Sequence, residues 1–170
     1  MSLLRIMVGV PGSGKSTYAK NMRANTDSVY ISRDDIRFSM VKEDEPYFSK
    51  EDAVFAEFTK QISDALAQDQ TVWADATHVN KNGRLKLLQS LSVEPDAIEI
   101  IFMNTSLEQC IAQNEKRAGT RSYVPVDVIK RMHKNLVFPS YQEGGYLYRM
   151  IWMKTPDTVI TIVPKEEDDE

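Results

Sequence analysis

The chain has 170 residues, of which 42% are hydrophobic and 27% charged, and it contains seven Gly and seven Pro. This length fits one domain, and the composition excludes a collagen-like chain and a Pro/Gly-rich disordered one. Of the 21 basic and 25 acidic residues, residues 165–170 hold one and five, which leaves 20 of each elsewhere. We therefore expect a neutral body over residues 1–164 with no broad nucleic-acid footprint, followed by a disordered acidic tail at 165–170.

Apolar segments alternate with helical patterns, which is typical of a three-layer α/β fold around a parallel sheet of about five strands. The expected strands are residues 3–8, 28–31, 71–74, 97–103, 149–154 and 158–163. The expected helices are residues 15–23, 33–40, 49–67, 81–91, 105–118 and 125–138. In the helix over 81–91, we expect Leu85, Leu88 and Leu91 to face inward.

Local signals mark where several of these helices begin. Ser32 with Asp35, and Thr105 with Glu108, match the capping-box pattern at a helix N-terminus. Pro125 suits the first position of a helix, because its missing N–H would have no partner there.

One cysteine, Cys110, excludes a disulfide within the chain and a cysteine-only zinc site. The apolar runs at 97–103 and 150–153 are much shorter than the roughly 18 residues that a membrane span needs. Only Arg5 precedes the core of the first apolar segment, and no secretory cleavage pattern follows it. We expect a cytoplasmic protein without a membrane partner.

The strongest motif is Gly9-Val10-Pro11-Gly12-Ser13-Gly14-Lys15-Ser16, which matches G-x-x-x-x-G-K-[ST] at every fixed position. Glycines let successive backbone N–H groups turn around a phosphate chain, and the following helix adds the positive end of its dipole. Lys15 would neutralise the β and γ phosphates, and the Ser16 hydroxyl would bind Mg²⁺. We expect ATP and Mg²⁺ to bind at Gly9, Pro11, Gly12, Ser13, Gly14, Lys15, Ser16 and Thr17.

Three classes of protein share such a loop: kinases, hydrolysing switches or motors, and modules that bind a nucleotide without chemistry. A switch GTPase should carry an N-K-x-D segment, and none occurs. A motor should carry an apolar strand that ends in Asp-Glu, whereas the third strand ends in Asp75-Ala76 and the fourth in Met103-Asn104. The small size, an acid pair after the second strand and an arginine-bearing loop near residue 120 favour a kinase.

The acid pair lies in Arg33-Asp34-Asp35-Ile36-Arg37, directly after the second expected strand. In open parallel sheets, ligands bind at the carboxyl ends of the strands. Either Asp34 or Asp35 could take the proton of an acceptor hydroxyl during phosphoryl transfer. Arg37 lies one helical turn from Asp34 and could keep it ionised or grip an anionic acceptor. Alternatively, both acids could simply complement the helix dipole, which suits Asp35 better because it is used by the capping box.

Polar residues also follow the third expected strand, in Asp75-Ala76-Thr77-His78-Val79-Asn80. Asp75 could orient Mg²⁺ or brace a cation of the acceptor site. Thr77 and Asn80 could bind a phosphate, although Asn80 fits a helix cap equally well. For His78, a polar loop position is the more ordinary interpretation than catalysis.

Basic residues gather in Lys116-Arg117-Ala118-Gly119-Thr120-Arg121 and continue at Lys130, Arg131 and Lys134. A mobile arginine lid that closes on the triphosphate would stabilise the charge of the transition state. A solvated basic end of a helix is the alternative, and the phosphate-binding loop favours the lid.

Taken together, these motifs resemble the kinase domain of the phage-type 5′-polynucleotide kinase family over about residues 3–138. The residues that carry the resemblance are Gly9–Thr17, Arg33-Asp34-Asp35-x-Arg37, Asp75-x-Thr77-x-x-Asn80, Lys116-Arg117 and Val124–Ile129. The resemblance implies a P-loop kinase fold with a helical lid over residues 1–164. It also implies transfer of the γ-phosphate of ATP to the 5′-OH end of DNA or RNA.

The resemblance further implies roles for matching residues. Asp34 would be the general base, and Arg37 would hold it and contact a phosphate of the acceptor. Lys15 and Ser16 would bind the triphosphate and Mg²⁺, and Arg117 would be the lid arginine. The acceptor site would comprise Arg33, Asp34, Arg37, Asp75 and Thr77, and the metal would be held by Ser16 and Asp75.

Two departures qualify this resemblance. The chain lacks the D-x-D-G-T phosphatase motif of the phage enzyme, so only kinase activity is implied, and a ligase or phosphatase would act from a separate chain. A neutral body with few stacking aromatic residues near the acceptor keeps a second function open. That function is a P-loop kinase for a nucleoside, metabolite or antibiotic hydroxyl.

Overall fold

The computed structural model describes residues 1–140, 143, 149–155 and 158–162. The expected acidic tail at 165–170 lies outside these residues. No helix among the described residues is long and apolar enough to cross a membrane.

The strands form one sheet in the order β2-β3-β1-β4-β5-β6. Neighbouring strands from β2 to β5 run parallel, and β6 runs antiparallel to β5. The predicted α/β class with about five parallel strands is therefore confirmed. The strands are β1 (Leu3–Val8), β2 (Ser28–Ser32), β3 (Thr71–Asp75), β4 (Ala97–Met103), β5 (Arg149–Thr155) and β6 (Thr158–Ile162).

The helices begin and end within a few residues of the predicted bounds. They are α1 (Lys15–Arg23), α2 (Arg33–Met40), α3 (Glu51–Leu66), α4 (Lys81–Gln89), α5 (Leu107–Glu115) and α6 (Val126–Lys134). Ser32 caps α2 as predicted, by accepting a hydrogen bond from the Asp35 backbone N–H at 3.2 Å. The predicted cap of α5 at Thr105 is wrong. Ser106 accepts from the Gln109 N–H instead, because Thr105 donates its hydroxyl to the Ser13 carbonyl at 2.7 Å.

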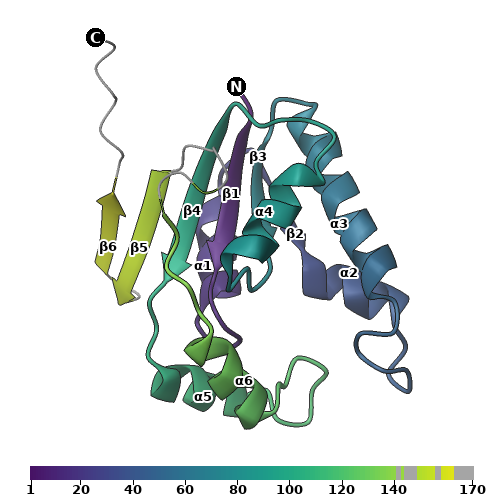
Figure 1. Ribbon diagram of the computed structural model, residues 1–170, viewed down its shortest axis with the longest axis vertical. Helices are drawn as coiled ribbons and strands as arrows, with labels where there is room; N and C mark the ends of the chain where they lie inside the picture. Colours follow the sequence, from purple (N-terminus) through teal and green to yellow (C-terminus); the bar gives the residue numbers. More distant parts are fainter. Residues whose placement is uncertain (141–142, 144–148, 156–157, 163–170) are drawn as a thin grey trace.

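Two apolar clusters lie on opposite faces of the sheet. The larger one joins β1 and β3 to α3 and α4, and contains Leu4, Ile6, Val54, Phe58 and Leu87. The smaller one joins the alternate strand residues to α1, and contains Met7, Ala19, Trp73, Ile101 and Met103. Figure 1 shows α3 and α4 on one side of the strands and α1 on the other, as an alternating strand pattern requires.

One predicted core face needs correction. In α4, Leu87 and Leu88 are buried, whereas Leu85 is only partly buried. Leu91 lies after the helix and packs, partly buried, against the larger cluster. The other buried side chain of this helix is Arg84, which pairs with Glu143. The helical pattern predicts burial from the spacing of apolar residues alone. It therefore does not predict the burial of an arginine whose charge is paired inside the protein.

The carboxyl ends of the parallel strands carry the segments with functional motifs. β1 leads into the glycine-rich loop, β2 into α2, and β3 into the segment 76–80. In Figure 1 the α5–α6 pair and α2 lie at this end of the sheet, on either side of the strands. A third apolar cluster of Val10, Cys110 and Ile129 packs α5 and α6 against the glycine-rich loop.

Candidate active site

The glycine-rich loop has the backbone geometry that its sequence predicts. Gly12 and Gly14 have φ angles of 82° and 89°, which L side chains rarely adopt. A Cβ atom on Gly12 would lie 2.2 Å from the Cys110 carbonyl oxygen, so only glycine fits against α5 there. α1 begins at Lys15, after Gly14 as its N-cap, without a side-chain cap and without an acid in its first turn. Its N-terminal N–H groups and dipole are therefore open to an anion.

Asp75 lies beside this loop rather than with the acids of α2. Its carboxylate is 4% exposed and accepts from the Ser16 hydroxyl at 2.5 Å and from the Tyr30 hydroxyl. The Lys15 ammonium lies 3.9 Å from the other carboxylate oxygen. Burial and the neighbouring Asp75 charge raise the pKa of Tyr30, so its phenol stays a donor.

Two buried polar atoms in this region have no hydrogen-bond partner. They are the Ser13 hydroxyl and the Asp75 oxygen that faces Lys15. Buried polar groups are almost always hydrogen-bonded, so these two oxygens are candidates to contact a ligand. Among the described residues no group of three His, Cys, Asp or Glu could hold a metal alone. A site with one carboxylate and one hydroxyl suits Mg²⁺ that also binds the phosphates of a nucleotide.

A second polar cluster surrounds Asp34 in α2. The Asp34 side chain is 56% exposed, and its Oδ1 accepts from the Tyr47 hydroxyl at 2.6 Å and from the Arg37 guanidinium. Burial and the adjacent Asp34 charge raise the pKa of Tyr47, which keeps its hydroxyl protonated. Asp34 is thus an exposed carboxylate that accepts from two donors. Asp35, by contrast, donates its backbone N–H to the Ser32 cap of α2.

Arg37 is 4% exposed, and its guanidinium makes five hydrogen-bond contacts. Three go to Glu51, at 2.8 to 3.1 Å, and the other two go to Asp34 and Tyr47. The Arg33 guanidinium also pairs with Glu51. Glu51 therefore holds the Arg37 guanidinium in place, and Arg37 in turn positions Asp34.

Sequence reasoning missed Glu51 and Tyr47. Glu51 is one of two acids in the first turn of α3, and no local pattern separates it from Asp52. A signal for Tyr47 was present in the sequence, because Tyr47 and Phe48 are adjacent aromatic residues in an otherwise polar segment.

The predicted lid joins α5 to α6, and its two arginines differ. The Arg117 guanidinium has no hydrogen bond or ion pair within the described part of the chain. The Arg121 guanidinium donates to the Phe38 and Val41 carbonyls at the end of α2 and lies 4.7 Å from the Phe38 ring centre. Arg121 thus fastens the lid segment to the helix that carries Asp34.

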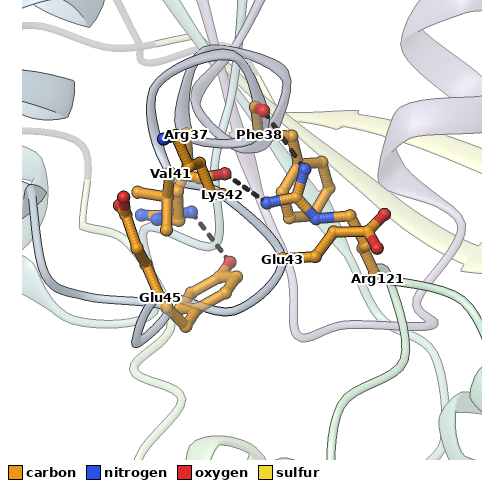
Figure 2. A pocket seen from close by; sticks show the side chains of 8 residues that line it. Arg37, Phe38, Val41, Lys42, Glu43, Glu45 and Arg121 are labelled. Carbon is orange, nitrogen blue, oxygen red and sulfur yellow. Dashed lines mark hydrogen bonds between the residues drawn. The ribbon is translucent and has the colours of Figure 1, made fainter.

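A cavity of about 150 Å³ lies where the lid meets α2. Figure 2 shows the Arg121 side chain directed at the backbone of residues 38–41, with the Arg37 side chain farther to the left. Its lining residues are Arg37, Phe38, Val41, Lys42, Glu43, Glu45, Tyr47 and Arg121.

The remaining candidates after β3 contact the backbone around them. The Thr77 carbonyl accepts from the Gly9 N–H at 3.0 Å, which anchors the start of the glycine-rich loop. The Asn80 side chain caps α4 by accepting from the Gly83 N–H. His78 is buried, and its Nδ1 lies 2.8 Å from the Met7 carbonyl. Burial lowers the pKa of His78 to about 4, so its ring is neutral near pH 7.

The sheet order, the glycine-rich loop at the end of β1 and the arginine-bearing lid define a P-loop kinase-like nucleotide-binding domain. The chain belongs to the AAA_33 family of AAA domains, which matches residues 4–139.

Solved structures with this fold include several kinases. A chain of the Pnkp1/Rnl/Hen1 RNA repair complex aligns with a TM-score of 0.70 and 23% identity, over 79% of this chain and 44% of that one. A gluconokinase from Sinorhizobium meliloti 1021 aligns with a TM-score of 0.59 and 17% identity, over 89% and 83%. Chaetomium thermophilum Kti12 in complex with ADP-AlF3 aligns with a TM-score of 0.57 and 17% identity, over 86% and 87%. This chain therefore spans less than half of the repair-complex chain.

Proposed function

We propose that this protein is an ATP-dependent 5′-hydroxyl polynucleotide kinase of the phage-type family. It would transfer the γ-phosphate of ATP to the 5′-OH end of DNA or RNA. The observation that carries the proposal is the Asp34 cluster, because an exposed carboxylate held by Arg37 and Tyr47 stands at the carboxyl edge of the sheet. The phosphate-binding loop follows β1 at the same edge of the sheet, and β3 lies between β1 and β2.

The nucleotide side of the reaction rests on the loop and on α1. The triphosphate would lie on the N–H groups of Gly9–Thr17, with Lys15 neutralising its charge and Arg117 closing over it. Ser16 and Asp75 would hold Mg²⁺, which supplies charge neutralisation at the phosphates when bound. The Ser13 hydroxyl and the Asp75 oxygen that faces Lys15 have no hydrogen-bond partner, which supports this assignment.

On the acceptor side, Asp34 would take the proton of the hydroxyl as it attacks the γ-phosphorus in line. Arg37 donates to this carboxylate, and Glu51 holds the guanidinium in place by several bonds. Of the other expected acceptor residues, Arg33 lies next to Glu51, whereas Asp75 and Thr77 contact the phosphate-binding loop. The contribution of Asp75 would therefore be to the nucleotide side.

The test is ³²P transfer from γ-labelled ATP with Mg²⁺ to a 5′-OH oligonucleotide, beside its 5′-phosphorylated form. We expect label on the 5′-OH strand alone. Asp34→Asn keeps the shape and should lower kcat by about 10²–10⁴-fold, while ATP binding persists. Asp35→Asn is the matched control, because its side chain makes none of the contacts of Asp34, and it should stay near the wild-type rate. Near-normal turnover by Asp34→Asn would rule out the assigned base.

A small hydroxyl compound is the second candidate acceptor. The specific observation for it is that the gluconokinase shares the fold over most of its own length. Transfer to sugars or nucleosides without transfer to oligonucleotides would favour this function. Because the Pnkp1 structures are of an RNA repair complex, a ligase or phosphatase on another chain is the partner that the polynucleotide function predicts.

A further inference from the structure

Two adjacent aromatic side chains are exposed in the segment between α2 and α3. Tyr47 is 41% and Phe48 is 65% exposed. Their rings meet edge to face, with centres 4.7 Å apart and planes at 90°. A neighbouring pair of exposed rings costs solvation free energy and has no role in the described core clusters, so it indicates a contact surface.

This aromatic pair adjoins the proposed catalytic carboxylate. The Tyr47 hydroxyl donates to Asp34, and the Arg37 guanidinium carbon lies 4.4 Å from the Tyr47 ring centre and 5.6 Å from that of Phe48. The cation lies nearer to the Tyr47 ring, and Phe48 is the more exposed residue of the pair. A flat group on Phe48 would therefore lie beside a hydroxyl that reacts at Asp34.

The segment that carries the pair is braced. The Lys50 ammonium donates to the Met40 carbonyl at 2.7 Å and lies 3.2 Å from the Glu45 carboxylate. The Ser49 N–H donates to the Pro46 carbonyl at 2.9 Å. A surface that is already ordered loses little conformational entropy when a ligand binds.

Charge favours a stacking contribution to acceptor binding. Outside residues 165–170 the chain holds 20 basic and 20 acidic residues, so the long-range attraction to phosphates is weak. Stacking of a base on an aromatic ring gives affinity without net charge, and every base offers a suitable face. A base of the terminal nucleotide also stays within one nucleotide of the 5′-OH.

We propose that Tyr47 and Phe48 form a stacking platform for an unpaired nucleobase at the 5′ end of the acceptor, with Phe48 as the main contact. This assignment rests on the proposed polynucleotide function and selects single-stranded or frayed 5′ ends as its substrates. Tyr47 ties the platform to Asp34, so stacking would place the terminal ribose at the reacting carboxylate.

The test is a fluorescence anisotropy titration without ATP. Two single-stranded 5′-OH oligonucleotides carry a fluorophore at the 3′ end, and one of them is abasic at its 5′-terminal nucleotide. We expect wild-type protein to bind the complete strand roughly 5- to 100-fold more tightly than the abasic one. Phe48→Ala should abolish this difference and Phe48→Trp should restore it. Met22→Ala, at an exposed apolar residue of α1, is the matched control and should preserve it.

In transfer assays, Phe48→Ala should raise the KM for the complete strand by the same factor and leave the KM for the abasic strand in place. Equal wild-type affinity for the two strands, no binding of either, or an unchanged difference in Phe48→Ala would overturn the platform. Label transfer decides the proposed function separately. Label transfer with equal affinity for the complete and abasic strands would contradict the platform alone. Tighter binding of the complete strand without label transfer would contradict the kinase function alone.

Discussion

His78 illustrates how surroundings decide the chemistry of a single residue. The sequence left it open between a loop position and a catalyst, and burial under the end of β1 makes it neutral. Desolvation is the largest influence on its pKa, the Met7 carbonyl and Asp75 favour the charged ring, and Arg33 and Arg84 disfavour it. A neutral imidazole held on a backbone carbonyl supports the loop rather than transferring protons.

This burial predicts a pH-dependent stability. The folded pKa of His78 is lowered to about 4 from 6.5, so the unfolded chain gains a proton first as the pH falls. The stabilisation is complete above about pH 6.5 and is lost progressively toward pH 4. Between pH 7.5 and 5.5 the free energy of unfolding should fall by about 1 kcal/mol from this residue. The measurement is urea denaturation at both pH values.

His78→Asn is the comparison variant, because asparagine tolerates the φ angle of 44° at this position. It should be less stable at pH 7.5, but its loss between the two pH values should be smaller by about 1 kcal/mol. Equal pH dependence of the two proteins would contradict the burial argument.

At the scale of elements, the glycine-rich loop depends on α5 as well as on its own sequence. Gly12 lies against the Cys110 carbonyl, and Thr105 donates to the Ser13 carbonyl just before α5 begins. The motif predicts the turn, but the close approach of a second helix makes the glycine at position 12 a packing requirement too. Gly119 in the lid has a similar φ of 81° with nothing within 4 Å of its would-be Cβ.

The two glycines therefore form a matched pair. Gly119→Ala should cost about 1 kcal/mol of unfolding free energy, from backbone strain alone. Gly12→Ala should cost a further 1–3 kcal/mol or so, because the loop and α5 must separate, and it should weaken binding of an ATP analogue. Urea denaturation and a nucleotide titration check both outcomes. Equal stability losses would show that the contact with α5 carries no energy.

At the scale of the whole molecule, a buried ion pair joins distant parts of the chain. Arg84 in α4 is fully buried and donates to both Glu143 oxygens, at 2.7 and 2.8 Å, and to the His78 carbonyl at 2.8 Å. It thus links the segment after β3 to the chain that follows α6. Removing one partner of such a pair lowers stability strongly, because the other charge stays buried without its partner.

Arg84→Met should lower the free energy of unfolding by about 3–5 kcal/mol, because it leaves the Glu143 charge buried without its partner. The double variant Arg84→Met/Glu143→Leu should recover much of this loss, since no unpaired charge remains. Thermal and urea denaturation of wild type, both single variants and the double variant measure the coupling. A double variant as unstable as the sum of the singles would indicate that the pair is not coupled.

Much of this arrangement could be predicted from the sequence. The strand and helix order, the phosphate-binding loop, the Ser32 cap and the pairing of Asp34 with Arg37 all follow from residues that are close along the chain. Glycine conformations, caps and helical spacing are local properties, and hydrophobic alternation reports only which face is buried.

What the sequence by itself determined was therefore the α/β class, the nucleotide loop and the acid-bearing helix after β2. Only the tertiary structure decided that Asp75 contacts Ser16 of the loop, that Glu51 pairs with Arg37, and that Arg121 donates to the end of α2. These contacts join residues 14 to 80 positions apart. They depend on how α2, α3 and the lid cross at the sheet edge, a geometry that arises from packing and leaves no local pattern.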